Sequence, residues 1–189
     1  MVSSTEKLTF HPINRADFGL LGEWLATPHV ARCWADDPSA AAIEADYGGC
    51  VDGTEAAEVF IASLDAKPVG LIQRYRVDAY PPYIEELAAL MTVPAAAYSI
   101  DYFLGPADVL GRGLGTRMIR AFIDRLWRDD PAASCVIVPT NALNRASWRS
   151  LERAGFVRVA SGDLTRDNPI DNPAHFIYRI DRPGAAIDS

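Results

Sequence analysis

The sequence contains few of the residues from which proteins build metal sites and disulfide frameworks. Only three cysteines and three histidines occur among its 189 residues, and Cys33, Cys50 and Cys135 lie far apart along the chain. Zinc sites and disulfide scaffolds need such residues in groups at short, regular spacing. We therefore expect no bound metal, and the isolated thiols favour a reducing, cytoplasmic environment.

Positive charge and long apolar runs are scarce as well. The chain has 18 Lys and Arg residues against 25 Asp and Glu residues, which leaves a formal net charge of −7. A nonspecific nucleic-acid binder needs a positive surface field, so no nucleic-acid partner is expected. No apolar run reaches the roughly 20 residues of a membrane span. The first residues, MVSSTEKLTFHP, lack the hydrophobic region of a secretory signal, so we expect no membrane partner either.

The composition that remains is that of an ordinary globular domain, with 49% hydrophobic and 23% charged residues. A chain of this length can bury a substantial core. We therefore expect a single domain over residues 1–189, with loose termini at 1–6 and 182–189.

Hydrophobic periodicity predicts strands and helices in a mixed order. Two β-rich runs, 59–64 and 69–77, flank the turn-like DAKP and predict a hairpin. Further strands are expected at 8–13, 98–105, 133–140, 156–164 and 174–180, and helices from about 14–17, from 37 to a stop at 48–49, after 115, and from 144 to 154. This order predicts an α+β fold with a central mixed, mostly antiparallel β-sheet flanked by about four helices. The apolar residues of 80–97 follow no regular helix or strand spacing, so this segment is expected to leave the core. Outside the core it could form part of a wall of the substrate site.

Three glycines, Gly111, Gly113 and Gly115, stand directly in front of an amphipathic segment. A P-loop would need a lysine after the last glycine, and a Rossmann turn would need glycine in place of Thr116. Glycines let successive amides converge at a helix N-terminus, and with basic residues nearby such a turn favours an anionic phosphate. A tight strand-to-helix turn without a ligand is the alternative.

The order of strand, glycine turn, amphipathic helix, strand and asparagine-led helix ending in AGF resembles the GNAT superfamily of acyl-coenzyme A N-acyltransferases. The segments LGRGLGTR and NRASWRSLERAGF carry this resemblance. EWLATPHVARCW, SIDYFLG and GRGLGT are similar to the aminoglycoside 6'-N-acetyltransferases. The likeness extends roughly from Phe10 to Val159 and is weakest between Tyr80 and Ala97.

The resemblance implies the α/β-type GNAT fold and acetyl-CoA (coenzyme A) as the cofactor, with its pyrophosphate held by the backbone of the glycine turn. Asn144 would contact the pantetheine arm, although an asparagine there is equally well explained as a helix N-cap. The cofactor-binding positions expected are Phe103, Leu104, Leu110, Gly111, Arg112, Gly113, Leu114, Gly115, Thr116, Asn144 and Ser147.

Acyl transfer from a thioester to an amine needs an oriented amine, a stabilised oxyanion and a proton for the departing thiolate. Asp101 matches the family aspartate that holds the amine and acts as base, and a turn hydrogen bond is its structural alternative. An ordinary Asp pKa near ~3.9 favours orienting the amine and relaying its proton through water. A backbone N–H around Phe103 or Leu104 would meet the oxyanion.

The proton donor to the thiolate departs from the family pattern. Many members carry a tyrosine four residues before the glycine of AGF, where this sequence has Leu151. The remaining candidates are Tyr102, Ser147, Ser150 and water.

The acceptor site is expected to combine an aromatic face with carboxylates, which suits a sugar that carries several ammonium groups. Trp34 matches the tryptophan of the sugar site in the similar enzymes, whereas Trp24 is assigned to the core. The substrate-binding positions expected are Trp34, Asp36, Asp37, Glu85, Glu86 and Asp101. A solvated acidic face is the alternative for Glu85 and Glu86.

These features together predict an aminoglycoside 6'-N-acetyltransferase that confers antibiotic resistance. Its partner would be a polycationic small-molecule amine, and the enzyme would be a monomer or a homodimer. Two alternatives remain. One is a GNAT enzyme acting on another amine, such as a siderophore precursor, a polyamine or a protein N-terminus, and the other is a noncatalytic module that binds coenzyme A.

Overall fold

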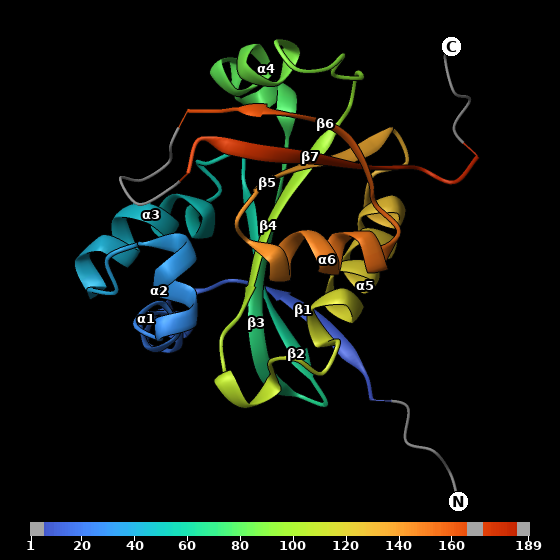
Figure 1. The fold of residues 1–189 in the computed structure, drawn as a ribbon. Helices are drawn as coiled ribbons and strands as arrows, with labels where there is room; N and C mark the ends of the chain where they lie inside the picture. The colour runs from blue at the N-terminus through green and yellow to red at the C-terminus, as the bar shows by residue number, and fades with distance from the viewer. Residues whose placement is uncertain (1–5, 166–171, 185–189) are drawn as a thin grey trace, which may run out of the picture. The chain divides into compact units, whose positions relative to one another are not determined.

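The computed structural model describes residues 6–165 and 172–184 (Figure 1). Of the termini expected to be loose, residues 1–5 and 185–189 lie outside the described residues. Within the described part, no helix is both long and apolar enough to span a bilayer. The same residues hold no group of three or more His, Cys, Asp or Glu side chains that could bind a metal ion.

Seven strands form one mixed sheet in the order β1-β2-β3-β4-β5-β7-β6. The pairs β1–β2, β5–β7 and β6–β7 are antiparallel, whereas β4 pairs with β5 in parallel. The strands are β1 Leu8–Pro12, β2 Glu58–Leu64, β3 Lys67–Arg76, β4 Tyr98–Leu104, β5 Cys135–Asn141, β6 Val157–Asp163 and β7 Ala174–Asp181. Each of the seven strands expected from the sequence is thereby confirmed.

The chain divides into two compact units. The first unit comprises Met1–Gln73 and Tyr102–Ala121, and the second comprises Arg74–Asp101 and Phe122–Ser189. The expectation of a single domain over the whole chain stays a prediction.

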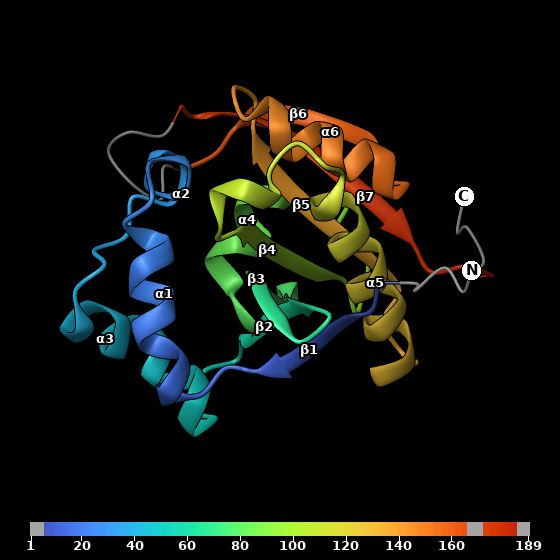
Figure 2. The same ribbon diagram turned by 90° about the horizontal axis from the view of Figure 1, so that it is seen from below.

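The first unit is built on the β1–β2–β3 side of the sheet and on three helices, α1 Phe18–Leu25, α2 Pro28–Trp34 and α3 Ala40–Asp52. Figure 2 shows these three helices gathered together, and α1 contacts both α2 and α3. Their apolar side chains form a core cluster with Val59, Ile61, Leu71 and Phe103. Trp24 belongs to it with 4% of its surface exposed, as expected.

A second cluster of the first unit packs the start of α5 Leu114–Asp129 against the sheet. Leu114 and Met118 of this helix join Ala62 and Val69, with Tyr102 and Leu104 beside them. Because successive strand residues alternate between faces, Tyr102 and Leu104 face this cluster while Phe103 faces the other.

The expected end of α3 at Gly48 and Gly49 is wrong. The helix continues to Asp52 and ends at Gly53, which adopts a left-handed φ of 70°. A Cβ at Gly48 would lie 2.7 Å from Glu44 Oε1, so this glycine permits close packing and does not end the helix.

The second unit contains α4 Pro81–Ala88, the C-terminal half of α5, and α6 Arg145–Ala154. Its core cluster combines Val77, Leu87, Ala97, Cys135, Ile137 and Ile177. Arg74 is buried and donates to Asp129 Oδ2 at 2.9 Å, which satisfies the buried cation. Arg182 donates to the carbonyls of Trp127, Asp130 and Ala133 and so holds the end of β7.

Two helices, α2 and α4, were not predicted, and the described residues therefore contain six α-helices where about four were expected. Both are short, with 7 and 8 residues, and both begin at a proline. The side chains of the segment 80–97 that meet the core are those of Tyr83, Ile84, Leu87, Leu90, Met91, Val93 and Ala97. The first five follow a helical spacing. The segment is thus partly helical, and its packing against the core corrects the expectation that it leaves the core.

Candidate functional site

The glycine turn, Leu110 to Thr116, requires glycine at two positions. Gly111 has a φ of 72° and Gly113 a φ of 76°, a left-handed region that costs other residues about 1–3 kcal/mol. No atom lies within 4 Å of a Cβ built at either glycine, so the turn presents bare, accessible backbone. This is a surface that an anion can approach closely.

Helix α5 begins at Leu114, within this turn. Arg117 N–H donates to Gly113 O at 3.2 Å, so the amides at 114–116 precede this bond and point toward the turn. Their partial positive charge adds to that of the exposed Arg112. Arg117 forms an ion pair with Glu6 at 2.7 Å. The turn, the helix end and Arg112 together fit a bound diphosphate.

The end of β4 is fixed by contacts that the sequence does not reveal. His29 Nε2 lies 2.8 Å from Leu104 O, and Gly105 N–H donates to Val69 O at 3.0 Å. A Cβ at Gly105 would clash with the Trp24 ring. A lone histidine 75 residues away carries no sequence signal for such a role.

Trp34 is the last residue of α2, and its ring meets the Phe103 ring edge-on with centroids 4.9 Å apart. Ala35 follows in the left-handed region with a φ of 55° and turns the chain toward Asp36. Of the expected acceptor residues, Trp34 and Asp36 are half-buried, so they have the partial access that a ligand contact requires.

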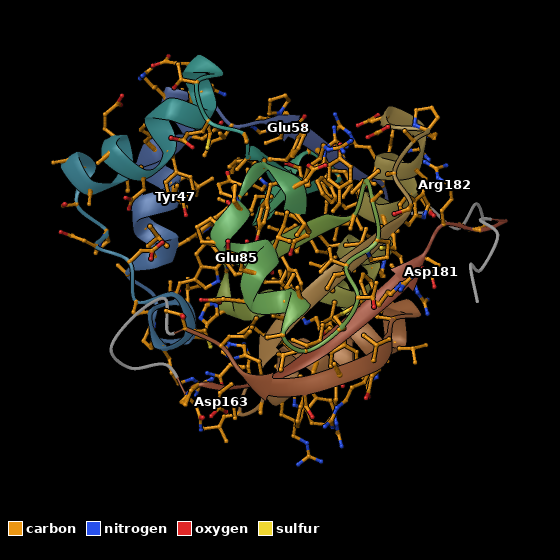
Figure 3. All side chains as sticks on the ribbon, turned by 90° about the horizontal axis from the view of Figure 1, so that it is seen from above. Tyr47, Glu58, Glu85, Asp163, Asp181 and Arg182 are labelled. Atoms are coloured by element: carbon orange, nitrogen blue, oxygen red, sulfur yellow. The ribbon has the colours of Figure 1, made fainter. Side chains whose placement is uncertain are left out.

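The two adjacent aspartates after α2 differ in their surroundings. Burial raises the pKa of Asp36, as does the nearby Asp46 charge, whereas a hydrogen bond from Tyr47 opposes the rise. Asp37 is exposed, and its Oδ1 accepts from Ser39 N–H at 2.9 Å at the start of α3. Asp37 therefore supports a helix start, and Asp36 is the better placed of the two to meet a ligand cation. Asp46 and Tyr47, the latter labelled on α3 in Figure 3, were missed by sequence reasoning.

In the second unit, Asp101 lies beside a cluster of tyrosines that sequence reasoning also missed. The Tyr75 ring meets Tyr80 and Tyr83 with centroids 5.2 and 6.0 Å apart. Tyr83 Oη lies 3.4 Å from Oγ of the buried Ser99. Burial raises the pKa of Tyr75 well above its usual range, and the Asp101 charge raises it further. The neutral Tyr75 hydroxyl is therefore close enough to Asp101 to respond to its charge.

Glu85 and Glu86 lie on α4, where adjacent residues point about 100° apart. Glu85 is exposed and projects from the helix in Figure 3, whereas Glu86 is half-buried. The structure thus gives the two carboxylates different environments and does not form them into a pair.

Asn144 caps α6, since its Oδ1 accepts from Ser147 N–H at 3.1 Å. The expected capping is confirmed, and the pantetheine contact of both residues stays a prediction. Leu151 is fully buried, and Ser150 Oγ donates to Ala146 O at 2.8 Å within the helix. Leu151 offers no proton, and the Ser150 proton is already engaged.

The expected site residues are divided between the two units. The glycine turn, Phe103, Leu104 and the Trp34–Asp37 segment belong to the first unit, whereas Asp101, Glu85, Glu86, Asn144 and Ser147 belong to the second. Within the first unit, the Trp34–Phe103 contact joins an expected acceptor residue to an expected cofactor residue.

Residues 14–164 match the acetyltransferase (GNAT) domain family. The chain belongs to this family. The chain is 29% identical to the aminoglycoside N(6')-acetyltransferase type 1 of Klebsiella pneumoniae over 183 aligned residues. The alignment covers 95% of this chain and 86% of that protein. The chain is also 34% identical to a kanamycin resistance protein of Rhizobium radiobacter over 80 residues, which cover 42% of this chain and 68% of that protein.

Solved structures confirm the expected GNAT fold. The crystal structure of aminoglycoside acetyltransferase AAC(6')-Ib in complex with coenzyme A and kanamycin superposes with a TM-score of 0.78 at 26% identity, over 93% of this chain and 95% of that one. An aminoglycoside N(6')-acetyltransferase of Legionella pneumophila shares the fold with a TM-score of 0.69 at 18% identity, over 96% of this chain and 95% of that one.

Proposed function

We propose that this GNAT protein transfers the acetyl group of acetyl-CoA to the 6'-amine of an aminoglycoside and thereby confers antibiotic resistance. The observation that carries the proposal is the glycine turn, which presents bare left-handed backbone at the start of α5. Similarity to AAC(6')-Ib, a structure solved with coenzyme A and kanamycin, supports the choice of both substrates.

In this proposal the backbone amides of residues 110–116 and the Arg112 guanidinium hold the cofactor's diphosphate. Phe103 and Leu104 of β4 and Asn144 and Ser147 of α6 contact its pantetheine arm. Bound acetyl-CoA supplies the acetyl group as a thioester. A backbone N–H at the end of β4 stabilises the charge that develops on the carbonyl oxygen.

Asp101 orients the acceptor ammonium and passes its proton to water, which leaves a neutral amine able to attack. The neighbouring Tyr75 hydroxyl stays neutral at physiological pH because its pKa is raised well above the usual range. Since Leu151 is a buried aliphatic side chain, we propose that the departing thiolate takes its proton from solvent water.

The acceptor is a polycationic small molecule in this proposal. Trp34 contacts its sugar ring, and the carboxylates of Asp36, Asp37, Glu85 and Glu86 attract its ammonium groups. We further propose that the enzyme acts in the cytoplasm as a monomer or homodimer.

The test is mass spectrometry of kanamycin incubated with the protein and acetyl-CoA, followed by NMR assignment of the acetylated amine. We expect a monoacetylated product modified at the 6' position. Acetyl-CoA consumed with a polyamine or siderophore precursor, but not with any aminoglycoside, would support a GNAT enzyme of different acceptor. Coenzyme A binding without transfer to any amine would support a noncatalytic module.

A further inference from the structure

The last residues of β4 are held from two sides. On one side, Gly105 N–H donates to Val69 O of β3 at 3.0 Å. On the other, Leu104 O lies 2.8 Å from His29 Nε2 of α2. The peptide group between Leu104 and Gly105 therefore has both its N–H and its C=O engaged, by two elements that lie far apart in the sequence.

The hydrogen bond to Leu104 determines which nitrogen of His29 carries a proton. A carbonyl oxygen only accepts, so Nε2 must be the donor. The bond therefore needs the tautomer with hydrogen on Nε2, or the doubly protonated ring, and it crosses a separation of 75 residues.

The same geometry orients the backbone N–H of Leu104. In an extended strand the N–H and C=O of one residue point to the same side. The Leu104 carbonyl meets His29, whereas the next N–H, that of Gly105, meets β3. The Leu104 N–H thus points away from β3, which makes Leu104 a better placed backbone donor than Phe103.

Other contacts of the first unit hold α2 and β4 in this register. The Trp34 ring at the far end of α2 meets Phe103, and the Trp24 ring covers Gly105 so closely that a Cβ there would clash. Helix α2 thus contacts two consecutive residues of β4, with aromatic packing at Phe103 and a hydrogen bond at Leu104, while Trp24 of α1 covers the next residue, Gly105. Of these contacts, only the hydrogen bond of His29 sets the direction of a backbone group.

We propose that His29 is a positioning residue for coenzyme A. Through its hydrogen bond to Leu104 it fixes the backbone donor at the end of β4 that meets the cofactor. This inference rests on the proposed function, because it assumes that Leu104 contacts the cofactor.

Calorimetric titration of coenzyme A into three variants tests the proposal. His29→Leu keeps side-chain bulk without a donor, and we expect the dissociation constant to rise about tenfold, the equivalent of one hydrogen bond. His29→Gln restores an amide donor and should stay within about threefold of the parent. His11→Leu, at an exposed histidine of the same unit, should not change affinity.

Parent affinity in folded His29→Leu would overturn the proposal and leave the proposed function intact. A parent protein that binds no coenzyme A would overturn both. If His29→Leu does not fold, nitrogen-15 NMR of the parent still decides. The proposal requires a proton on Nε2 with and without coenzyme A, and a movement of the Leu104 amide resonance on binding. A proton on Nδ1 alone, or an unmoved Leu104 resonance, would overturn it.

Discussion

The glycine turn and the region around Asp101 present their ligand-facing groups in opposite ways. The turn uses backbone, and its conformation comes from two glycines with φ values of 72° and 76° within a few residues of each other. Around Asp101 the groups are side chains, Tyr75 of β3, Tyr83 of α4 and Ser99 of β4, which only the fold brings together. A backbone site should tolerate most side-chain changes except at its glycines, whereas a side-chain site should respond to the loss of one charge.

The sharpest test of the side-chain half is Asp101→Asn, which keeps the size of the residue and removes its charge. We expect kcat to fall by about 10²–10⁴, the usual contribution of a group that handles a proton. Coenzyme A affinity and Tm should stay near those of the parent. The matched control is Asp108→Asn, an exposed aspartate before the glycine turn that should leave kcat unchanged. Near-parental kcat of Asp101→Asn with saturating kanamycin would exclude the role.

The backbone half is tested by Gly113→Val. The new side chain strains a left-handed position and occupies the space that a diphosphate would approach. Coenzyme A affinity, measured by calorimetry, should fall about tenfold or more. Gly53→Val imposes the same strain, at a φ of 70° with equally open surroundings, but away from the turn. If both variants bind coenzyme A alike, the turn does not hold the cofactor.

A smaller effect is expected from the double variant Glu85→Gln, Glu86→Gln. Exposed charge pairs contribute about 0.2–1 kcal/mol each, so KM for kanamycin should rise a few-fold while kcat stays nearly intact. The rise should diminish at high ionic strength, because salt screens such pairs. Asp163→Asn, at the exposed carboxylate labelled in Figure 3, serves as the control. An unchanged KM across several aminoglycosides would show that neither glutamate contacts the acceptor and that both are only solvated surface residues.

The smallest expected effect is on stability, at Asp36. Its folded pKa is raised, chiefly by burial, so its ionised form costs stability above that pKa and costs nothing below the ordinary unfolded value. Asp36→Asn should therefore be slightly more stable than the parent at pH 7, by less than about 1 kcal/mol because the residue is only half-buried. This gain should vanish as the pH falls below the ordinary Asp value. Thermal unfolding at several pH values measures it, and a variant less stable than the parent at pH 7 would contradict the prediction.

Much of the fold could be predicted from the sequence because its signals are short-range. Gly155, with a φ of 106°, ends α6, and Asn144 begins it with a hydrogen bond to a backbone group three residues on. The amphipathic segment after the three glycines predicted α5, whose Leu114, Met118 and Phe122 are buried four residues apart. The helices that escaped prediction, α2 and α4, have 7 and 8 residues, and which of their side chains face a core is set by the distant parts of the chain that they pack against.

The residues of the candidate site also fall into those that short-range signals predicted and those that only long-range contacts revealed. The glycine turn could be predicted from residue types, since glycine adopts its left-handed φ values at little cost, and the strand pattern placed Asp101 on the strand that leads to it. The tertiary structure alone decided that His29 meets Leu104, that Tyr75 borders Asp101, and that Asp36 and not Asp37 is the half-buried aspartate after α2. Those assignments depend on contacts between residues far apart in the chain. A local pattern of residue types cannot predict them, because it does not specify which distant group a side chain will contact.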